Sequence, residues 1–436
     1  MAKQRVSTVM PRLRFPEFRS AKTWTTIELR QLSEFVTERV GTTDCTPYTV
    51  SSGVGLVSQQ EKLGRTIAGN SLKNYIVLQK NDFAYNKSAT KAFPQGFIAR
   101  YVGEDRAAVP NSIFTCFRTN DDLIDPTYLD NLFSTNLHGN WLRNRIAVGA
   151  RAHGSLNVSD EDLMDLPVPL PAGSSSLTEQ QKIADCLTSL DEVIAAQGRI
   201  VAALKAHKRG LMQQLFPHEG ETRPRLRVPE FRDASEWITR PLGELMVIGS
   251  SRRVHESDWM TTGVPFYRAR EIVAIGKGEP INPLFISEDL YTEFTGFTGE
   301  IEEGQLLVTG VGSIGIPYLV KSDDRFYFKD GNIIWLKNNQ ADLLGDFLLR
   351  LFESDYVQGQ IAKMAGIGTV GTYTIENAKR TIAVFPLDKG EQQRIADCLS
   401  SLDTQITAES HQLAALKTHK QGLMQQLFPS REVVAA

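Results

Sequence analysis

The chain of 436 residues contains only four cysteines, and no two of them form a CxxC pair. Zinc fingers and disulfide scaffolds need more cysteines at closer spacing, so the sequence disfavours both. An excess of charge of one sign is also missing, because 48 Lys and Arg residues stand against 51 Asp and Glu residues. This balance excludes a generally basic nucleic-acid coat, although a local basic face remains possible.

Long hydrophobic runs are absent as well. The uncharged stretch Leu306–Val320 contains three glycines and a proline, and it is too short to span a bilayer. The first seven residues, Met1-Ala-Lys-Gln-Arg-Val-Ser, lack the apolar core of a signal peptide. Hydrophobic residues make up 41% and charged residues 23%, as in ordinary globular proteins. We therefore expect a cytoplasmic, globular protein of two to four domains.

Signatures of catalysis are missing too. No GxxxxGK[ST] loop is present, which argues against ATP-driven work by this chain. Gly310-Val-Gly-Ser-Ile-Gly315 fits GxGxxG, but a strand-like run follows it instead of a helix, so a turn is favoured over a nucleotide site. Asn282-Pro-Leu-Phe285 lacks the second proline of the Asn-Pro-Pro-Tyr loop of amino-methyltransferases. The seven histidines form no cluster with metal-ligand spacing. We expect neither a catalytic residue nor a metal site.

Internal repeats dominate what is present. Residues 179–217 recur without a gap at 391–429, and 27 of these 39 positions are identical. A second repeat relates Pro11–Arg19 to Pro224–Arg232. The blocks between these markers resemble each other only faintly, so the order is variable, constant, variable, constant. The parts are 1–23 (repeat segment), 24–172 (first block), 177–217 (helix), 218–236 (linker with the repeat), 237–388 (second block), 389–429 (helix) and 430–436 (tail).

The repeated 39-residue segments predict two long helices. Their apolar residues recur at alternating steps of four and three, which is a heptad seam, and Pro217 and Pro429 end them. Neither seam is stable in water, so we expect the two helices to pair antiparallel within the chain. Burial of both helices in one domain core is the alternative. The expected seam consists of Leu190, Ile194, Val201, Leu204, Lys208, Leu211, Leu402, Ile406, Glu409, Leu413, Leu416, Lys420 and Leu423.

Polar residues in the seams predict how the two helices are aligned. A lysine that faces a leucine would be buried without a partner, which is unfavourable. We therefore expect Lys208 to lie beside Glu409, and Lys420 beside Gln197. Full overlap of the helices, which places Lys208 against Leu402, is the alternative. The central layers of the expected alignment pair Leu204 with Leu413 and Val201 with Leu416.

The two variable blocks have an α+β pattern. Each contains short strand-like runs, then an amphipathic helix, Pro126–Leu142 or Ala341–Met364, and then a glycine-rich loop. The loops Gly149–Gly154 and Gly366–Gly371 align with each other. The expected strands are Tyr75–Leu78, Gly96–Ala99 and Ile113–Phe117 in the first block, and Leu306–Val308, Ile316–Val320 and Ile333–Leu336 in the second.

Basic clusters occur in the loops of both variable blocks. Arginine can bind guanine edges with two hydrogen bonds, while lysine, hydroxyl groups and backbone N–H groups hold phosphates. A solvated surface is the alternative for each cluster taken singly, and a cluster in each block favours DNA contact. The candidate DNA-binding residues are Asn86, Lys87, Ser88, Lys91, Arg143, Arg145, Arg151 and His153 in the first block, and Arg252, Arg253, Arg268, Arg270, Gly312, Ser313 and Thr369 in the second.

This arrangement resembles the specificity subunit of Type I restriction-modification enzymes over essentially the whole chain. The most specific matches are Leu166-Pro-Val-Pro-Leu-Pro171 before Glu179-Gln-Gln-Lys-Ile-Ala184, and Val384-Phe-Pro-Leu387 before Glu391-Gln-Gln-Arg-Ile-Ala396. Glu303–Gly315 also matches the target recognition domains of that family. In the first block the corresponding stretch, Lys80–Ser88, departs from the glycine-rich form.

The resemblance implies a fold and a function. The fold would be α+β, with two α/β target recognition domains separated by two long helices in an antiparallel coiled coil with a pseudo-two-fold repeat. Each domain would read one half of a bipartite double-stranded DNA target, and the helices would set the gap and dock two methyltransferase subunits. S-adenosylmethionine, ATP and Mg would belong to these and to the motor-nuclease subunits, so this chain would be non-catalytic. A self-contained methyltransferase or nuclease and a non-DNA coiled-coil scaffold are the alternatives.

Overall fold

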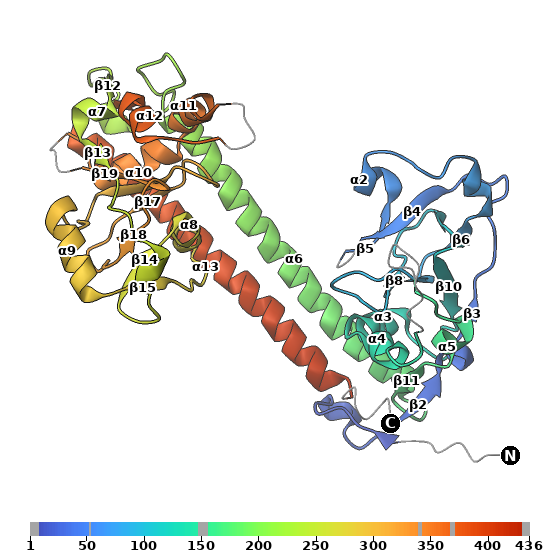
Figure 1. Cartoon of the computed structure of the whole chain (residues 1–436). Coiled ribbons are helices and arrows are strands. Elements are labelled where there is room, and N and C mark those ends of the chain that lie inside the picture. The colour runs from blue at the N-terminus through green and yellow to red at the C-terminus, as the bar shows by residue number, and fades with distance from the viewer. Residues whose placement is uncertain (1–7, 52–53, 147–155, 339–341, 367–370, 430–436) are drawn as a thin grey trace. The chain divides into compact units, whose positions relative to one another are not determined.

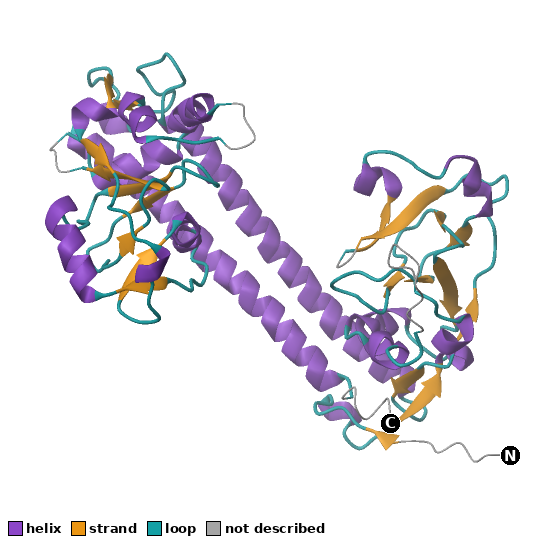
Figure 2. Cartoon of the chain, viewed as in Figure 1, coloured by secondary structure: helices purple, strands orange, loops and turns teal. Residues whose placement is uncertain are grey.

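The computed structural model describes residues 8–51, 54–146, 156–338, 342–366 and 371–429. The chain divides into two compact units (Figure 1). Unit 1 contains the chain up to Gln197 and the segment from Gln412 onward, and unit 2 is Gly198–His411. Both units mix helices and strands, which confirms the expected α+β class (Figure 2). Within the described ranges, no helix is long and apolar enough to cross a membrane.

The two repeated segments form the two longest helices, α6 (Ser176–Leu215) and α13 (Lys389–Leu427). In unit 1 the start of α6 shares a hydrophobic core with the end of α13, since Ile183 and Leu427 belong to one cluster. In unit 2 the start of α13 shares a core with the end of α6, as Ile395 and Leu215 do. Within each unit the helices therefore pair antiparallel, as expected.

The expected alignment of the helices is wrong in both units. Lys208 Nζ lies 2.7 and 2.8 Å from the carboxylate oxygens of Asp403, and Lys420 Nζ lies 2.6 and 2.5 Å from those of Asp191. Each partner stands six residues before the expected one, Glu409 or Gln197. Asp403 follows Leu402 directly, so the observed alignment is that of full overlap. The layers of Leu204 with Leu413 and Val201 with Leu416 belong to the rejected alignment.

The reason lies in the reach of the lysine side chain. Asp403 and Asp191 each follow a seam leucine, at the edge of the seam. A lysine can bury its aliphatic stem along the seam and place its ammonium on that edge. The Lys208 side chain is only 19% exposed, yet its ammonium has two carboxylate partners, Asp403 and Glu353. The cost of burying a charge that faces a leucine therefore does not arise.

The described residues of unit 1 form three sheets. The first sheet has the strand order β3-β10-β7-β8, the second β5-β4-β9-β6, and the small third sheet β1-β2-β11. All neighbours pair antiparallel except β4 with β9. The strands are β1 (Thr8–Val9), β2 (Trp24–Glu28), β3 (Ser33–Phe35), β4 (Thr46–Ser51), β5 (Gly55–Ser58), β6 (Ile76–Leu78), β7 (Phe83–Asn86), β8 (Phe97–Arg100), β9 (Ala107–Val109), β10 (Phe114–Thr119) and β11 (Pro167–Leu170). The short helices are α1 (Leu29–Leu32), α2 (Gln59–Leu63), α3 (Pro126–Ser134), α4 (Leu137–Leu142) and α5 (Asp160–Met164).

Unit 2 repeats this plan. Its four-stranded sheet has the order β13-β19-β16-β17, its second sheet β15-β14-β18, and its small sheet β12-β20. The strands are β12 (Ile238–Pro241), β13 (Val247–Gly249), β14 (Val264–Tyr267), β15 (Leu284–Ile286), β16 (Leu306–Thr309), β17 (Pro317–Leu319), β18 (Tyr327–Phe328), β19 (Ile333–Lys337) and β20 (Ile382–Phe385). The helices are α7 (Leu242–Leu245), α8 (Ala269–Gly276), α9 (Glu288–Thr298), α10 (Gly345–Glu353), α11 (Asp355–Ala365) and α12 (Ile375–Arg380).

The order of pairing shows that the two variable blocks share one fold. The sheets β3-β10-β7-β8 and β13-β19-β16-β17 have the same order: β3 or β13 pairs with β10 or β19, which pairs with an antiparallel hairpin, β7–β8 or β16–β17. In each second sheet one strand has an antiparallel neighbour and a parallel one. All six expected strands exist, within two residues at either end.

Each amphipathic helix expected in the blocks is in fact two helices. In the first block the helix breaks between α3 and α4, where Asn136 adopts a left-handed φ of 63°. Asparagine tolerates this conformation better than most residues. In the second block Ser354 is extended and separates α10 from α11. The apolar period continues through both breaks, so the pattern alone did not distinguish two short helices from one long helix.

The repeated motifs form the same buried anchor in both units. In unit 1 the Arg14 guanidinium donates two hydrogen bonds of 2.7 Å to the Glu179 carboxylate. Trp24 Nε1 donates a third, of 3.2 Å, to the same carboxylate. Glu179 is fully buried. The anchor therefore joins the N-terminal repeat segment, β2 and the start of α6.

Unit 2 repeats the anchor with Arg227, Glu391 and Trp237. The distances are again 2.7 Å for the two arginine bonds and 3.2 Å for the tryptophan bond. The next residue of each helix also has a repeated role. Gln180 accepts a hydrogen bond from the backbone at the start of α3, and Gln392 accepts one at the start of α10. The repeated residues therefore form the same hydrogen bonds in both units, and these bonds attach two different variable blocks to the helices.

Candidate nucleic-acid and subunit interfaces

The Gly310–Gly315 segment of unit 2 contacts the residues that follow the second glycine-rich loop. Gly310 O accepts a hydrogen bond of 2.9 Å from Tyr373 N, and Val311 forms an isolated bridge with Thr372. The start of the Gly310–Gly315 segment and the residues just after Gly371 therefore meet where β16 ends. The candidate DNA contacts Gly312 and Ser313 lie in the first segment, whereas the candidate Thr369 of the second loop lies outside the described residues.

The Gly310–Gly315 segment is a turn and not the start of a helix, as expected. Gly312 and Gly315 both have φ of 78°, which favours glycine. Thr309 is fully buried, and its hydroxyl donates to Ser313 O and accepts from Ile316 N. The turn leads directly into β17. Gly312 and the Ser313 side chain remain exposed at its tip.

Lys80–Ser88 of the first block is the structural counterpart of Glu303–Gly315. Asn81 adopts a left-handed φ of 73°, and Gly304 has φ of 83° at the equivalent place before the strand. The turn after β7 also contacts the first described residues after the Gly149–Gly154 loop, since Leu156 N donates to Lys87 O at 2.8 Å. Lys80–Ser88 therefore has other side chains than Glu303–Gly315 but occupies the same position in the fold.

Lys87 is tied into the domain. Its ammonium lies 2.7 Å from an Asp160 carboxylate oxygen, which also accepts a 2.6 Å hydrogen bond from Thr115. Burial acts to raise the pKa of the Asp160 carboxyl, but the bonds from Lys87 and Thr115 outweigh it, so this pKa is lowered. The ion pair fixes the stem of the turn. Its neighbours Ser88 and Lys91 are half-buried and exposed, respectively.

Asn86 is half-buried, and the α4 residue His138 is buried. His138 is 1% exposed, and burial lowers its pKa to about 4, so the imidazole is neutral at physiological pH. Asn86 is the last residue of β7, and its buried Oδ1 has no hydrogen-bond partner among the described residues. A DNA role for Asn86 stays a prediction.

Arg268 and Arg270 converge on one buried carboxylate. Glu271 is 3% exposed, and it accepts hydrogen bonds of 3.1 and 2.8 Å from Arg268 and of 2.7 Å from Arg270. Burial acts to raise the pKa of Glu271, but the arginine bonds outweigh it and lower the pKa. The Arg270 side chain is nevertheless 71% exposed. Glu271 thus holds a partly free guanidinium at the start of α8.

Arg252 and Arg253 are also exposed on unit 2. The Arg252 guanidinium lies 4.4 Å from the ring centre of Phe297 and 5.3 Å from that of Phe294. Phe297 is 70% exposed. Arg253 Nε donates to Asp330 at 3.1 Å. An arginine plane stacked on an exposed aromatic ring can contact a phosphate or a base edge.

The remaining basic candidates of the first block follow α4. Arg145 stacks on Trp141 at 3.3 Å and donates to its carbonyl oxygen. Arg143 is exposed, and among the described residues it has no ion-pair partner, nor does Lys91. Arg151, His153 and Thr369 lie outside the described residues, so their roles stay predictions.

Some exposed residues near the start of α6 recur unchanged near the start of α13, although folding does not require exposed residues to be identical. Eight of the twelve differences between the two 39-residue copies fall within Glu192–Val201 and its counterpart. The exposed residues on one face near the start of each helix are instead identical. Surface substitutions usually change stability by less than about 0.5 kcal/mol. The identical exposed residues at the start of the helices are Gln181, Asp185 and Ser189 of α6 and Gln393, Asp397 and Ser401 of α13.

Spacing places these residues on one face of each helix, because they recur every four residues. Asp397 accepts a 2.8 Å hydrogen bond from Gln393 along this face. We define the duplicated patch as these three residues in each unit. A patch that is exposed, identical and present twice is suited to two copies of one partner.

Sequence reasoning missed Glu271 and the aspartates beside the seam. The sequence did contain a signal for Glu271. A glutamate at the third position of a helix is typical of a capping box, and Glu271 stands three residues after the N-cap residue Arg268. Asp191 and Asp403 are repeat-identical and lie next to seam leucines. Pairing Lys208 with Asp403, and Lys420 with its repeat counterpart Asp191, would have given the correct alignment.

Comparisons with known proteins agree with the architecture. No protein-family model matches the chain. The Type I restriction enzyme MjaVIII specificity subunit of Methanocaldococcus jannaschii is 24% identical over 315 residues, which is 71% of each chain. A Haemophilus influenzae protein assigned as a type I restriction enzyme specificity subunit is 26% identical over 246 residues. That match covers 56% of this chain and 57% of the relative, so it spans less than two thirds of the relative's length.

A solved structure extends the likeness to the fold of the whole chain. The Type-I restriction-modification system S subunit from M. genitalium matches 97% of this chain and 99% of its own, with a TM-score of 0.55 and 14% identity. The curated homologues are type I restriction enzyme specificity subunits, which confirms the resemblance found in the sequence.

Proposed function

We propose that this chain is the non-catalytic DNA-specificity subunit of a Type I restriction-modification enzyme. The observation that carries the proposal is the attachment of two divergent blocks of one fold to two near-identical anchors. In this arrangement the helices and anchors are nearly the same in both units, while the two variable blocks differ. Each block reads one half of a bipartite double-stranded DNA target. Single-molecule sequencing of the source genome tests this: methylated adenines should mark a two-part motif with a fixed gap that disappears when this chain is deleted.

Partner subunits supply the chemistry in this proposal. Two methyltransferase subunits dock on the duplicated patches and bring S-adenosylmethionine, and motor-nuclease subunits bring ATP and Mg²⁺. The support from this chain is the identity of exposed residues that contribute little to folding. A chain that methylates DNA by itself would contradict the proposal.

Arg270 provides a test of DNA contact. Replacing it by glutamine should relax one base position in one half-site and weaken methylation of the target by about 5-fold to 150-fold, the loss of one base-reading arginine. Arg270 is preferable to Arg268, because Arg268 still neutralises the buried Glu271. The other half-site should be unchanged and serves as an internal reference.

The matched control for Arg270→Gln is Arg240→Gln. Arg240 is an exposed arginine of the same unit, but it lies on β12 in the sheet next to the helices. Its replacement should leave the motif and the extent of methylation unchanged. If Arg270→Gln and Arg240→Gln methylate alike, Arg270 does not read a base.

The duplicated patch provides a test of docking. A chain with Asp185→Lys and Asp397→Lys should bind its methyltransferase subunit about 10-fold more weakly or worse, which is typical of a central interface residue. The control is a chain with Glu192→Lys and Thr404→Lys, two exposed and repeat-equivalent positions in the divergent part of the helices. Isothermal titration calorimetry compares them. Equal affinity of both variants would place docking elsewhere.

A further inference from the structure

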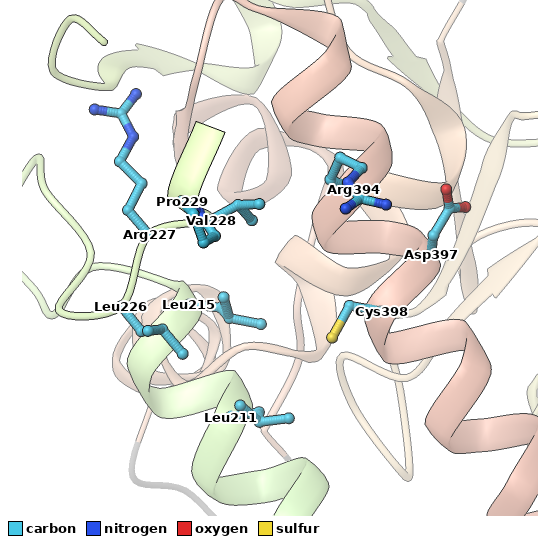
Figure 3. Close-up of a pocket in the computed structure, with 9 residues that line it drawn as sticks. All are labelled: Leu211, Leu215, Leu226, Arg227, Val228, Pro229, Arg394, Asp397 and Cys398. Carbon is cyan, nitrogen blue, oxygen red and sulfur yellow. The ribbon is translucent and has the colours of Figure 1, made fainter. Parts of the chain in front are cut away.

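Unit 2 has an apolar groove between the two helices and the linker. The groove has a volume of about 430 Å³. Its apolar lining comes from the end of α6 and from the repeat segment, and the first turns of α13 form its rim (Figure 3). The Arg227 guanidinium points away from the groove, toward its buried partner Glu391. The lining residues are Leu211, Leu215, Leu226, Arg227, Val228, Pro229, Arg394, Asp397 and Cys398.

The groove is continuous with the duplicated patch, because Asp397 belongs to both. Leu226 is 38% exposed beside it, and its repeat counterpart Leu13 is 37% exposed in unit 1. The same backbone contact places both leucines: Leu226 N donates to Gln214 O, and Leu13 N donates to Gln426 O, each at 2.9 Å. Each unit therefore presents an exposed leucine in the same setting.

The two units differ at two lining positions. Seven of the nine lining residues have identical repeat counterparts, and the exceptions are Val228, which is Phe15 in unit 1, and Arg394, which is Lys182. Phe15 packs against the hydrophobic core of unit 1, and Lys182 Nζ lies 5.8 Å from the centre of its ring. Val228 packs against the core of unit 2 in the same way, but its side chain is much smaller than the phenylalanine ring.

We infer that the groove of unit 2 accepts an apolar side chain of the docking methyltransferase subunit, and that the two docking sites therefore differ in affinity. The chemistry of the occupant is indicated by Phe15, an aromatic side chain that the protein itself places at the equivalent position. The first methyltransferase subunit then binds at unit 2 and the second at unit 1. This inference rests on the proposed function, since it assumes methyltransferase docking.

Thiol labelling tests the order of binding in the unmodified protein. Cys398 lines the groove and is exposed, and its repeat counterpart Cys186 is half-buried in unit 1. The other two cysteines are buried. With one equivalent of the purified methyltransferase subunit, maleimide labelling of Cys398 should slow several-fold relative to the free chain, while labelling of Cys186 stays unchanged. Equal protection of both thiols, or protection of Cys186 first, would overturn the inference.

Reciprocal variants test the cause. Native mass spectrometry should give a second dissociation constant well above the statistical value, which is about four times the first for two equal sites. In Val228→Phe the first binding step should weaken about 10-fold, because unit 2 then resembles unit 1. In Phe15→Val the second step should strengthen instead. Constants that neither substitution changes would contradict the inference.

The outcomes separate this inference from the proposed function. If no complex with the methyltransferase subunit forms, the proposed function fails. If a two-to-one complex forms with equal sites, only the inference fails. If the free chain dimerises and Val228→Phe abolishes the dimer, a second copy of the chain occupies the groove, and the inference is wrong.

Discussion

Replacing Glu391 by alanine is expected to lower the free energy of unfolding of unit 2 by about 3–5 kcal/mol, as found when one partner of a buried ion pair is removed. The carboxylate is fully buried and accepts three hydrogen bonds, from Arg227 and Trp237. Its removal leaves the Arg227 charge only 8% exposed and without a carboxylate partner. Hydrogen exchange in β12 and in the first turns of α13 measures the loss locally, which matters because a protein of two units need not unfold in one step.

The repeat supplies the matched experiment. Glu179→Ala should produce the same loss in unit 1 and leave unit 2 unchanged, because Arg14 and Trp24 bind Glu179 at the same distances. Glu192→Ala is the control, since this glutamate is exposed on α6. A change below about 1 kcal/mol in both anchor variants would mean that the anchor is not a main source of stability.

Local patterns in the sequence predicted most of the secondary structure. The helices α6 and α13 follow from a heptad seam, a property of neighbouring residues that needs no tertiary information. The strands β10 and β19 follow from short apolar, β-branched runs. The break at Asn136 was not predictable in this way, because the apolar period continues past a single residue in the left-handed conformation.

The alignment of the helices failed for a physical reason. The expected alignment placed the charges of Lys208 and Lys420 on the seam itself. A lysine instead carries its charge several ångströms from its Cα atom. Their partners Asp403 and Asp191 therefore lie beside the seam and not on it. Alignments that depend on long charged side chains need the position of the charge as well as the position in the heptad.

The ion-pair partners of the candidate DNA-binding residues were also not predictable from the sequence. Composition and loop position singled out Arg268 and Arg270, but not the buried Glu271 that holds them. Lys87 has a carboxylate partner, Asp160, that is 73 residues away in the chain. Pairings over such a distance depend on the fold and are not encoded in the spacing of neighbouring residues.

Inserting one heptad into both helices is expected to abolish methylation of the native target and to create a target with a longer gap. The insertions belong between Gln197 and Gly198 in α6 and between His411 and Gln412 in α13, where the two compact units divide. Both anchors and both ion pairs of Lys208 and Lys420 are then kept. A heptad keeps the seam in phase and lengthens each helix by about 10 Å at 1.5 Å per residue. On DNA this corresponds to at most about three base pairs.

A heptad inserted into α6 alone is the control, because it puts the helices out of alignment in one unit or the other and should destroy activity. The double insertion should instead methylate a motif with both original half-sites and a gap longer by one to about three base pairs, as read by single-molecule sequencing of modified DNA. Only variants that still methylate are informative. If they recognise the original gap, helix length does not set the spacing, and the methyltransferase subunits must position the two half-sites.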